Sequence, residues 1–372
     1  MKNIIFIVGT RPNFMKLAPV YNALNKNPTT YNLSIIHTGQ HYDYNMSDIF
    51  FKQLHLPQNI INLNVNNNTP NAQLAEIMIK LEVQFTLLKP HFVVVFGDVT
   101  STLAGALTAN KMNIPLVHIE SGNRSFDKTM PEEINRILVD QMTNYYFISE
   151  PNGINNLLNE RLITYEEENK KWFYVGNPMI DTLLTFIDVA NETLYYKSLD
   201  LTKNNYILIT LHRQSNVDDD DNLQKIINII NLLAERYMIV MPVHPRKRSK
   251  IVALLKPVET IKIIDPLGYI EFINLLANCG LIMTDSGGVQ EESTVLGIPC
   301  ITLRPNTERP ITCSHGTNTL YNICDDSSNG NNQLISLVDS KYQQYKLNET
   351  NNILYWDGKS GERIVDIFDN II

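Results

Sequence analysis

The sequence contains little cysteine and no long apolar segment. Only four cysteines occur among 372 residues, and none forms a Cys-x-x-Cys pair, which excludes a disulfide framework and a zinc site of the usual spacing. No segment approaches the roughly 18 consecutive apolar residues that a membrane helix requires, so we expect no membrane partner. The apolar run before Gly9 is too short for a signal peptide. These absences predict a cytoplasmic enzyme or binding protein.

Positive charge is also scarce. Lys and Arg total 31 residues against 39 for Asp and Glu, which gives a formal net charge of -8. The longest uninterrupted cationic run is residues 246–248. A protein that binds nucleic acid gains affinity by placing a broad cationic surface against the phosphates and releasing counterions. The acidic balance therefore predicts that nucleic acid is not a partner.

Familiar nucleotide and metal motifs are missing from the places where they would be expected. The loop after the first apolar run has neither the Gly-x-x-x-x-Gly-Lys-Ser/Thr spacing of a P-loop nor the Gly-x-Gly-x-x-Gly spacing of a dinucleotide site. Neither His212 nor His244 belongs to a His-x-x-x-His pair. We therefore expect no metal ion and no other cofactor.

Short apolar runs alternate with segments of helical periodicity along the chain. Runs that are apolar on both faces are typical of central strands in a parallel sheet. They lie at residues 4–8, 33–37, 92–96, 116–119 and 145–148, and again at 206–211, 238–242, 261–264, 281–284 and 300–303. The pattern predicts an α/β protein with two Rossmann-like domains that face a central cleft. We expect domains at residues 1–178 and 179–354, with residues 355–372 forming a helix that crosses back to the first domain.

Two loops after predicted strands are suited to an anionic ligand. The first brings Arg11 and Lys16 to the start of a helix, where free amides and the helix dipole already favour negative charge. The second contains Ser286, Gly287 and Gly288, which can present a hydroxyl and several amides to a phosphate. Glu292 lies one helical turn further on. Because a carboxylate repels phosphate, a sugar diol such as ribose is its expected partner.

Acidic side chains follow the predicted strands of the first domain. Asp98 and Glu120 each end an apolar run, and Glu132 lies in a later Pro-Glu-Glu motif beside Glu133, which we expect to be a solvent-exposed or salt-bridged residue. Carboxyl groups that share a cleft raise some of each other's pKa values, which separates an acid from a base near neutral pH. His212 and His244, beside arginines at equivalent strand ends of the second domain, point to the same cleft.

These motifs together resemble the non-hydrolysing UDP-N-acetylglucosamine 2-epimerases, a family with the two-Rossmann-domain architecture of one class of glycosyltransferases (GT-B). The resemblance covers nearly the whole chain. The motifs that carry it are Gly9-Thr10-Arg11-Pro12, His37-Thr38-Gly39-Gln40-His41, Gly97-Asp98-Val99, Pro131-Glu132-Glu133-Ile134-Asn135-Arg136, Val175-Gly176-Asn177, Leu211-His212-Arg213, Pro242-Val243-His244-Pro245, Asp285-Ser286-Gly287-Gly288-Val289-Gln290-Glu291-Glu292, Thr307-Glu308-Arg309-Pro310 and Asp357-Gly358-Lys359.

The resemblance implies a role for each site residue. It assigns the acid and base chemistry to three carboxylates, with Arg136 supporting Glu132, and it counts His212 with the catalytic residues as well as with the diphosphate. The catalytic set is Asp98, Glu120, Glu132 and His212. The diphosphate set is Arg11, Lys16, His212, Ser286, Gly287 and Arg309, with Gly288 and His244 as further substrate contacts. Glu292 is expected to bind the ribose, and the uracil to rest near Tyr269 and Phe272.

The implied reaction is reversible C2 epimerisation of a UDP-N-acetylhexosamine, in the supply of nucleotide sugars for surface glycans. It proceeds by anti elimination of UDP to a 2-acetamidoglucal, followed by re-addition. The implied partners are the UDP-sugar substrate and a second copy of the chain in a homodimer. The enzyme class is an isomerase without a cofactor.

Two departures from the family pattern leave alternatives open. Asn123 stands where many members have leucine, and some relatives that act on 6-deoxy sugars have Asn there, so a UDP-6-deoxy-L-hexosamine is an alternative substrate. A GT-B glycosyltransferase is a more distant alternative. Several members bind an activating second UDP-sugar through a Gln-His-x-Gln segment. Residues 40–43 lack its second glutamine, so we expect no such activation.

Overall fold

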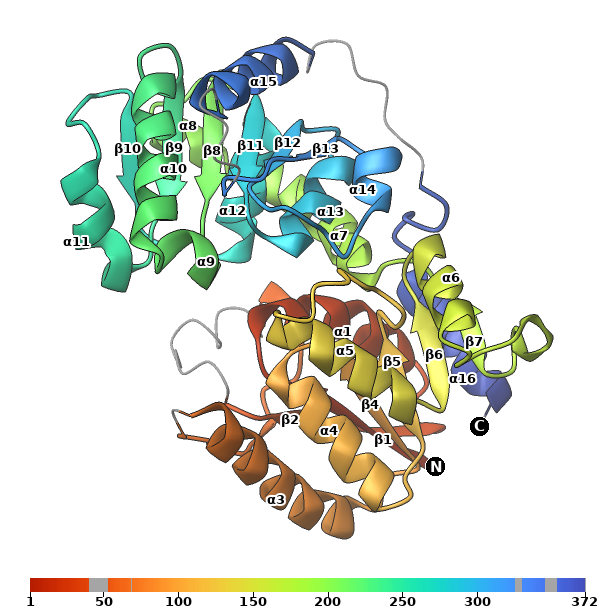
Figure 1. Ribbon diagram of the computed structural model, residues 1–372. Coiled ribbons are helices and arrows are strands. Elements are labelled where there is room, and N and C mark those ends of the chain that lie inside the picture. Colours follow the sequence, from red (N-terminus) through yellow and green to blue (C-terminus); the bar gives the residue numbers. More distant parts are fainter. Residues whose placement is uncertain (40–52, 68, 325–329, 345–352, 372) are drawn as a thin grey trace. The chain divides into compact units, whose positions relative to one another are not determined.

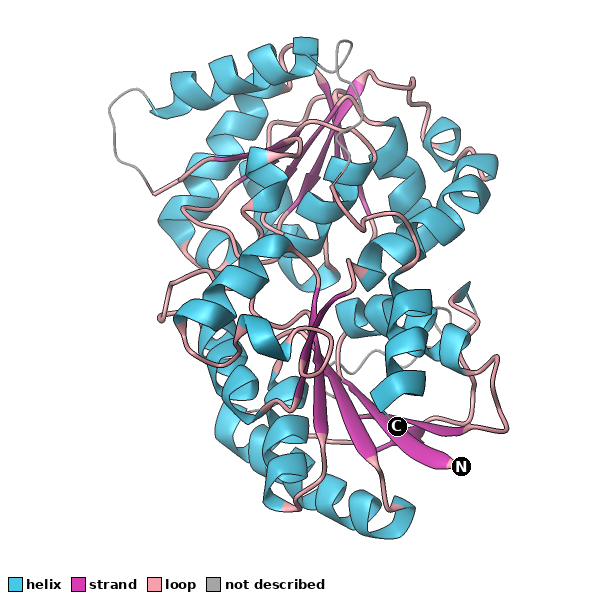
Figure 2. Ribbon diagram, turned by 90° about the vertical axis from the view of Figure 1, so that its right-hand side faces the viewer, coloured by secondary structure: helices cyan, strands magenta, loops and turns pink. Residues whose placement is uncertain are grey.

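The computed structural model describes residues 1–39, 53–67, 69–324, 330–344 and 353–371 (Figure 1). The chain forms two compact units, Met1–Thr182 with Leu354–Ile372, and Leu183–Ile353. Each unit contains one parallel sheet with interleaved helices (Figure 2). The predicted α/β class is confirmed.

The first unit contains a sheet of seven strands in the order β3-β2-β1-β4-β5-β6-β7. Its strands are β1 Lys2–Val8, β2 Tyr31–His37, β3 Ile61–Asn62, β4 Phe92–Phe96, β5 Leu116–Ile119, β6 Tyr145–Ile148 and β7 Trp172–Tyr174. Its helices are α1 Arg11–Leu24, α3 Pro70–Leu88, α4 Thr100–Lys111, α5 Pro131–Met142, α6 Pro151–Asn159, the short η1 Tyr165–Glu167, the start of α7 Pro178–Glu192, and α16 Ser360–Ile371.

Helices on both faces of this sheet explain why its strands are continuously apolar. Ile5 and Ile7 of β1 pack in one cluster with Leu81 of α3 and Leu103 of α4. Phe6 lies between them in the sequence and points to the opposite face, where it meets Tyr21 of α1 edge to face at a centroid distance of 6.2 Å. A strand that is buried on both faces shows no apolar and polar alternation, which is the pattern read from the sequence.

The last helix, α16, packs on the first sheet, as predicted. The ring of Phe368 meets Phe92 and Phe147 edge to face, at centroid distances of 5.9 Å and 5.7 Å. At the start of the helix, a side chain on Gly361 would place its Cβ 2.7 Å from the carbonyl oxygen of Pro19 in α1. Only glycine permits this close approach, so α16 packs tightly against α1 and belongs to the first unit.

The second unit contains a sheet of six strands in the order β10-β9-β8-β11-β12-β13. Its strands are β8 Tyr206–Thr210, β9 Met238–Pro242, β10 Ile261–Ile264, β11 Leu281–Thr284, β12 Cys300–Thr302 and β13 Asn318–Leu320. Its helices are the rest of α7, α8 Tyr195–Ser198, α9 Gln214–Val217, α10 Asp220–Leu233, α11 Pro245–Leu254, α12 Tyr269–Asn278, α13 Gly287–Val295, α14 Ile311–Ser314 and α15 Gly330–Gln344.

The order of strands reverses once in each sheet. In the first unit β1 pairs with both β2 and β4, and in the second β8 pairs with both β9 and β11. In doubly wound sheets, ligands bind at the carboxyl ends of the strands beside such a reversal. The loops after β1, β4, β8 and β11 are therefore the first places to look for a site.

Among residues that the structure describes, none of the helices is both long enough and apolar enough to cross a bilayer.

Candidate functional site

The loop after β1 is held in place by Asn13. Its side-chain oxygen accepts hydrogen bonds from the backbone N–H groups of Gly9 (3.1 Å) and Thr10 (3.2 Å). Its amide nitrogen donates to the carbonyl oxygen of Phe96, the last residue of β4, at 3.1 Å. Asn13 therefore connects the loop after β1 with the loop after β4, beside the strand reversal. Arg11 is exposed at the start of α1.

Lys16 forms a buried ion pair with Glu120, the residue that directly follows β5. Only 5% of each residue is exposed. Glu120 has a φ of +73°, a left-handed conformation that is uncommon for a residue other than glycine and that occurs at functional sites. The sequence predicts Lys16 at the diphosphate, whereas in this structure the charge of Lys16 is compensated by Glu120, a catalytic candidate.

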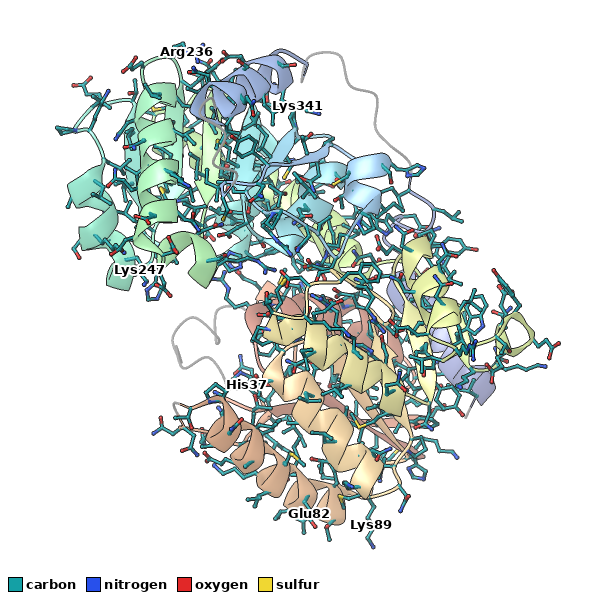
Figure 3. The ribbon with its side chains drawn as sticks, viewed as in Figure 1. His37, Glu82, Lys89, Arg236, Lys247 and Lys341 are labelled. Atoms are coloured by element: carbon teal, nitrogen blue, oxygen red, sulfur yellow. The ribbon has the colours of Figure 1, made fainter. Side chains whose placement is uncertain are left out.

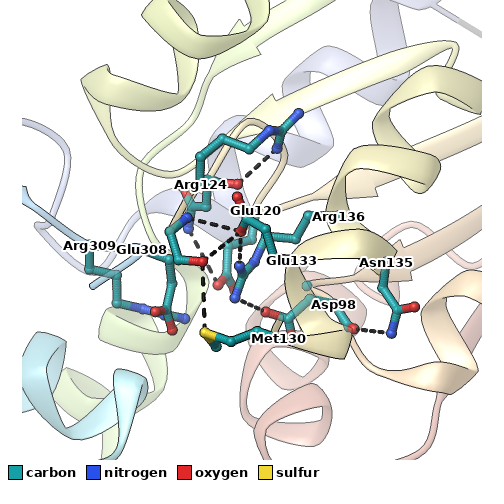
Figure 4. A network of polar contacts seen from close by, with 12 residues as sticks. Asp98, Glu120, Arg124, Met130, Glu133, Asn135, Arg136, Glu308 and Arg309 are labelled. Atoms are coloured by element: carbon teal, nitrogen blue, oxygen red, sulfur yellow. Dashed lines mark hydrogen bonds and ion pairs between the residues drawn. The ribbon is translucent and has the colours of Figure 1, made fainter. Parts of the chain in front are cut away.

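Asp98 is fixed by two neighbouring residues of α5 (Figure 4). The guanidinium of Arg136 forms an ion pair with the Asp98 carboxylate, and the side-chain amide of Asn135 donates to the Asp98 carbonyl oxygen at 2.8 Å. Gly97, the residue before Asp98, donates from its backbone N–H to the carbonyl oxygen of Ile119 at 3.0 Å. This bond links the loop of Asp98 to the loop of Glu120, so two of the predicted carboxylates lie on adjoining loops.

Within α5, Arg136 pairs with Glu133, a partner that the sequence did not predict, and the support of Glu132 by Arg136 stays a prediction. Glu133 is 1% exposed and pairs with Arg136. It also accepts hydrogen bonds from the backbone N–H groups of Ser125 (2.9 Å) and Phe126 (2.8 Å). Residues three apart in a helix share a face, which brings Glu133 to Arg136. Glu132 itself is half-buried.

In the second unit, His212 is held by Asp285, which the sequence analysis did not single out. Its Nδ1 lies 2.7 Å from the Asp285 carboxylate, which also accepts hydrogen bonds from the backbone N–H of Arg213 (3.0 Å) and the amide of Asn216 (3.1 Å). Burial raises the pKa of Asp285, but the hydrogen bond and charge of His212 outweigh it, so this pKa lies below its ordinary value. The position of Asp285 directly after β11 was the available signal.

The start of α13 has the features of an anion site. Ser286 precedes the helix, and Ser286, Gly287 and Gly288 are all half-buried. A Cβ on Gly287 would lie 2.5 Å from a terminal nitrogen of Arg309, so this guanidinium lies against the first turn of the helix. Arg309 is held there by ion pairs with Glu308 and Glu291. Helix amides and a fixed cation together favour a phosphate.

Glu292 is buried in the same helix and faces Tyr269 of α12. The tyrosine hydroxyl donates to the Glu292 carboxylate at 3.1 Å, and Glu292 is 2% exposed. Burial raises the pKa of Glu292 to about 8, although the hydrogen bond from Tyr269 acts in the opposite direction. Phe272 is half-buried on the same helix as Tyr269, whereas His244 is exposed at the start of α11.

The contacts above bring several of the predicted residues together within each unit. In the first unit they are Lys16, Asp98, Glu120 and Arg136, and in the second they are His212, Tyr269, Ser286, Gly287, Gly288, Glu292 and Arg309. Across the described residues, no group of three or more His, Cys, Asp or Glu side chains is arranged to hold a metal ion. The segment 40–43, which concerns a second UDP-sugar, lies outside the described residues.

Known proteins resemble this chain over almost its full length. The profile of the family described as UDP-N-acetylglucosamine 2-epimerase matches residues 22–369. The UDP-N-acetylglucosamine 2-epimerase of Methanocaldococcus jannaschii is 42% identical over 372 residues, which cover 97% of each chain. The UDP-2,3-diacetamido-2,3-dideoxy-D-glucuronate 2-epimerase of Pseudomonas aeruginosa is 41% identical over 326 residues, which cover 87% of this chain and 89% of that protein.

Solved structures agree with this likeness. The crystal structure of the Methanocaldococcus jannaschii UDP-GlcNAc 2-epimerase in complex with UDP-GlcNAc and UDP has a TM-score of 0.87 to this chain at 41% identity, with 100% of both chains covered. A Medicago truncatula glycosyltransferase complexed with UDP-glucose has a TM-score of 0.66 at 11% identity, over 100% of this chain and 98% of that one. The second likeness concerns the fold alone, and it confirms the GT-B-like class.

Proposed function

The chain belongs to the UDP-N-acetylglucosamine 2-epimerase family, and from this premise we propose that it catalyses the reversible C2 epimerisation of a UDP-linked 2-acetamido sugar, of the UDP-GlcNAc to UDP-ManNAc type. The observation that carries the proposal is the pair of carboxylates on adjoining loops, Asp98 held by Arg136 and Glu120 held by Lys16. Fixed carboxylates of this kind can remove and return a proton. The N-terminus of α13, together with Arg309, is the proposed binding site for the diphosphate.

The proposed reaction is an anti elimination followed by an addition. A carboxylate takes the proton from C2, the C2–H electron pair forms the C1=C2 double bond, and the C1–O bond breaks so that UDP leaves with its bonding electrons. Addition of UDP to C1 of the 2-acetamidoglucal, with a proton delivered to the other face of C2, gives the epimer. Asp98, Glu120 and Glu132 supply the acid and base groups. Arg11, His212, Ser286, Gly287, Gly288 and Arg309 stabilise the negative charge that grows on the departing diphosphate.

Incubation with UDP-GlcNAc in D₂O, without any acceptor, tests the proposal. Elimination exchanges the C2 proton with solvent, so we expect deuterium at C2 in both epimers by NMR or mass spectrometry. A glycosyltransferase of the same fold would leave the sugar unchanged under these conditions. Recovery of UDP-GlcNAc and its 6-deoxy and uronate analogues without deuterium would overturn the proposal.

The residue type at position 123 motivates a second candidate within the same reaction, a UDP-6-deoxy-L-hexosamine, because some relatives that act on 6-deoxy sugars have Asn there. Asn123 is 2% exposed, its amide nitrogen lies 3.5 Å from a carboxylate oxygen of Glu120, and its amide oxygen is buried without a hydrogen-bond partner among the described residues. Sequence identity to these relatives does not distinguish between the sugars, because relatives named for different sugars are 42% and 41% identical to this chain. The deuterium experiment should therefore include UDP-GlcNAc, a UDP-6-deoxy-2-acetamido sugar and a UDP-2,3-diacetamido uronate.

The raised pKa of Glu292 leads us to expect that UDP binds more tightly as the pH rises toward 8. The pKa of Glu292 in the free protein is raised to about 8 by burial, so the group is mainly protonated at pH 7. Hydroxyl donors of a bound ribose favour the ionised form, so binding lowers this pKa and releases a proton. The affinity should then increase by up to about tenfold per pH unit below 8 and level off above it.

Isothermal titration calorimetry with UDP between pH 7 and pH 9, in two buffers with different ionisation enthalpies, measures this release directly. Glu292→Gln is the matched control, because an amide of the same shape cannot ionise. The variant should bind UDP with neither the pH dependence nor the proton release. An affinity of the wild-type protein that does not change over this range would contradict the ribose assignment.

A stripe on α3 supports the expected homodimer. Ile79, Val83 and Leu87 are 65%, 55% and 69% exposed and recur every four residues on α3, the helix that carries Glu82 and ends just before Lys89 in Figure 3. Residues four apart share one helix face, and contiguous exposed apolar surface marks interaction sites. We propose that this face meets the same face of a second copy.

Ile79→Asp with Val83→Asp is expected to convert the dimer to a monomer, because burying two carboxylates at an apolar contact is unfavourable. Light scattering after size-exclusion chromatography should give half the mass of the wild-type protein. Tyr165→Asp is the control, since Tyr165 is 70% exposed in η1 and lies outside the stripe. A wild-type monomer, or a double variant that remains dimeric, would exclude this interface.

A further inference from the structure

Four ionisable side chains of the first unit form a continuous chain of hydrogen bonds that the proposed reaction does not use. Nδ1 of His118, in β5, is hydrogen-bonded to Oδ1 of Asp140, in α5, at 2.7 Å. The other carboxylate oxygen of Asp140 accepts a hydrogen bond from Arg124, also at 2.7 Å. Arg124 then donates to both oxygens of Glu160, at 2.8 Å and 2.7 Å. His118 and Asp140 are 0% exposed, and the chain reaches the surface only at the Glu160 side chain, which is 29% exposed.

The second ring nitrogen of His118 is also hydrogen-bonded. This nitrogen, Nε2, lies 2.9 Å from the carbonyl oxygen of Gly97. Because a carbonyl oxygen can only accept, Nε2 is the donor in this bond. Burial raises the pKa of Asp140, but His118 and Arg124 outweigh it and hold this pKa below its ordinary value.

The chain contacts the backbone on both loops that carry the catalytic candidates. His118 bonds the carbonyl oxygen of Gly97, the residue before Asp98. Asp140 accepts from the backbone N–H of Gly122 at 3.1 Å, and Arg124 donates to the carbonyl oxygen of Asn123 at 2.8 Å. Gly97 and Gly122 both have positive φ, at +61° and +83°, so these are tightly turned segments. One buried network therefore sets the backbone beside Asp98 and just after Glu120.

Stability alone is a poor explanation for this arrangement. Buried ion pairs cost much of their attraction in desolvation, and apolar replacements of similar volume are often as stable or more stable. A network of fully bonded polar groups does, however, specify one geometry. A network that ends on the two loops of an acid and a base is suited to holding those loops at a fixed separation and orientation.

We propose that His118, Asp140 and Arg124 are positioning residues, which hold the Asp98 and Glu120 loops in the geometry for proton transfer at C2 without touching the substrate. This inference rests on the proposed function of Asp98 and Glu120. Its principal contact is the hydrogen bond from His118 to Gly97, because that bond acts directly on the residue before Asp98.

Two amide replacements of His118 separate the contacts of its ring. The amide nitrogen of Gln lies about where Nε2 lies, so His118→Gln keeps a donor for Gly97. The amide of Asn lies about where Nδ1 lies, so His118→Asn keeps a contact to Asp140 and loses the one to Gly97. We expect His118→Asn to lower kcat by about 100-fold, the usual effect of a small misplacement of catalytic groups. The KM and the affinity for UDP should stay unchanged, and His118→Gln should recover most of the loss.

The surface end of the network provides a variant that does not disturb the core. Glu160→Ala removes the exposed partner of Arg124 and should lower kcat without changing KM, whereas Glu167→Ala, which removes the exposed partner of Lys171, should change neither. The proposal is overturned if His118→Asn and Glu160→Ala both turn over like the wild-type protein. It is also overturned if His118→Gln loses as much kcat as His118→Asn. The wild-type protein is assayed before the variants. If it shows no deuterium exchange at C2, the proposed function is refuted, and the variants no longer test the positioning role.

Discussion

Asp98→Asn, Glu120→Gln and Glu132→Gln are each expected to lower the rate of C2 exchange by about a hundredfold or more, the usual scale for removal of an acid or base. The structure makes the first replacement clean. At position 98 an amide oxygen can still accept from Arg136, which also keeps its ion pair with Glu133, so the effect should fall on kcat. At position 120 an amide oxygen can still accept from Lys16 but leaves the lysine charge buried, so this variant should lose stability as well as kcat.

Deuterium incorporation at C2 measures the loss, and calorimetry with UDP should show binding like that of the wild-type protein. Glu166→Gln is the control, because Glu166 is exposed in η1 of the same unit and belongs to neither the loop after β4 nor the loop after β5. Activity that is unchanged in all three variants would remove the carboxylates from the mechanism. Loss of UDP binding together with activity would show instead that the replacements disturb the fold.

Lys16→Met is expected to destabilise the first unit by about 3–5 kcal/mol, the usual cost of removing one partner of a buried ion pair. Lys16 and Glu120 are each 5% exposed, so the remaining Glu120 charge would have no solvent to compensate it. The two tryptophans, Trp172 and Trp356, both lie in the first unit, so their fluorescence during urea unfolding reports on this unit alone.

The double variant Lys16→Met with Glu120→Gln separates charge from packing. Removing the second charge should restore most of the lost stability, because the remaining amide is neutral. Lys80→Met is the comparison, since the pair of Lys80 with Glu76 is partly exposed and such surface pairs contribute only about 0–1 kcal/mol. A single Lys16→Met variant that unfolds at the wild-type urea concentration, or a double variant that is no more stable than the single one, would contradict the buried-charge account.

The sequence was sufficient for the class of fold and for the loops that carry chemistry. Ten strands could be predicted, because strands that are covered on both faces appear as continuous apolar runs: β1, β2, β4, β5, β6, β8, β9, β10, β11 and β12. Their carboxyl ends are positions where a polar side chain stands out, which is why Arg11, Asp98, Glu120 and His212 could be singled out. The strands β3, β7 and β13 were missed, because two or three residues are too few to show any periodicity.

The tertiary structure decided which of these residues act on one another. The pairs Lys16 with Glu120 and His212 with Asp285 could not be read from spacing. Spacing places both Glu132 and Glu133 within reach of Arg136, and the structure shows the pair with Glu133. Burial patterns report which face of an element meets the core, and this information needs only the order of apolar residues. A hydrogen bond requires two groups at about 3 Å with the correct orientation. That condition depends on how separate strands and helices pack, so only the folded chain determines it.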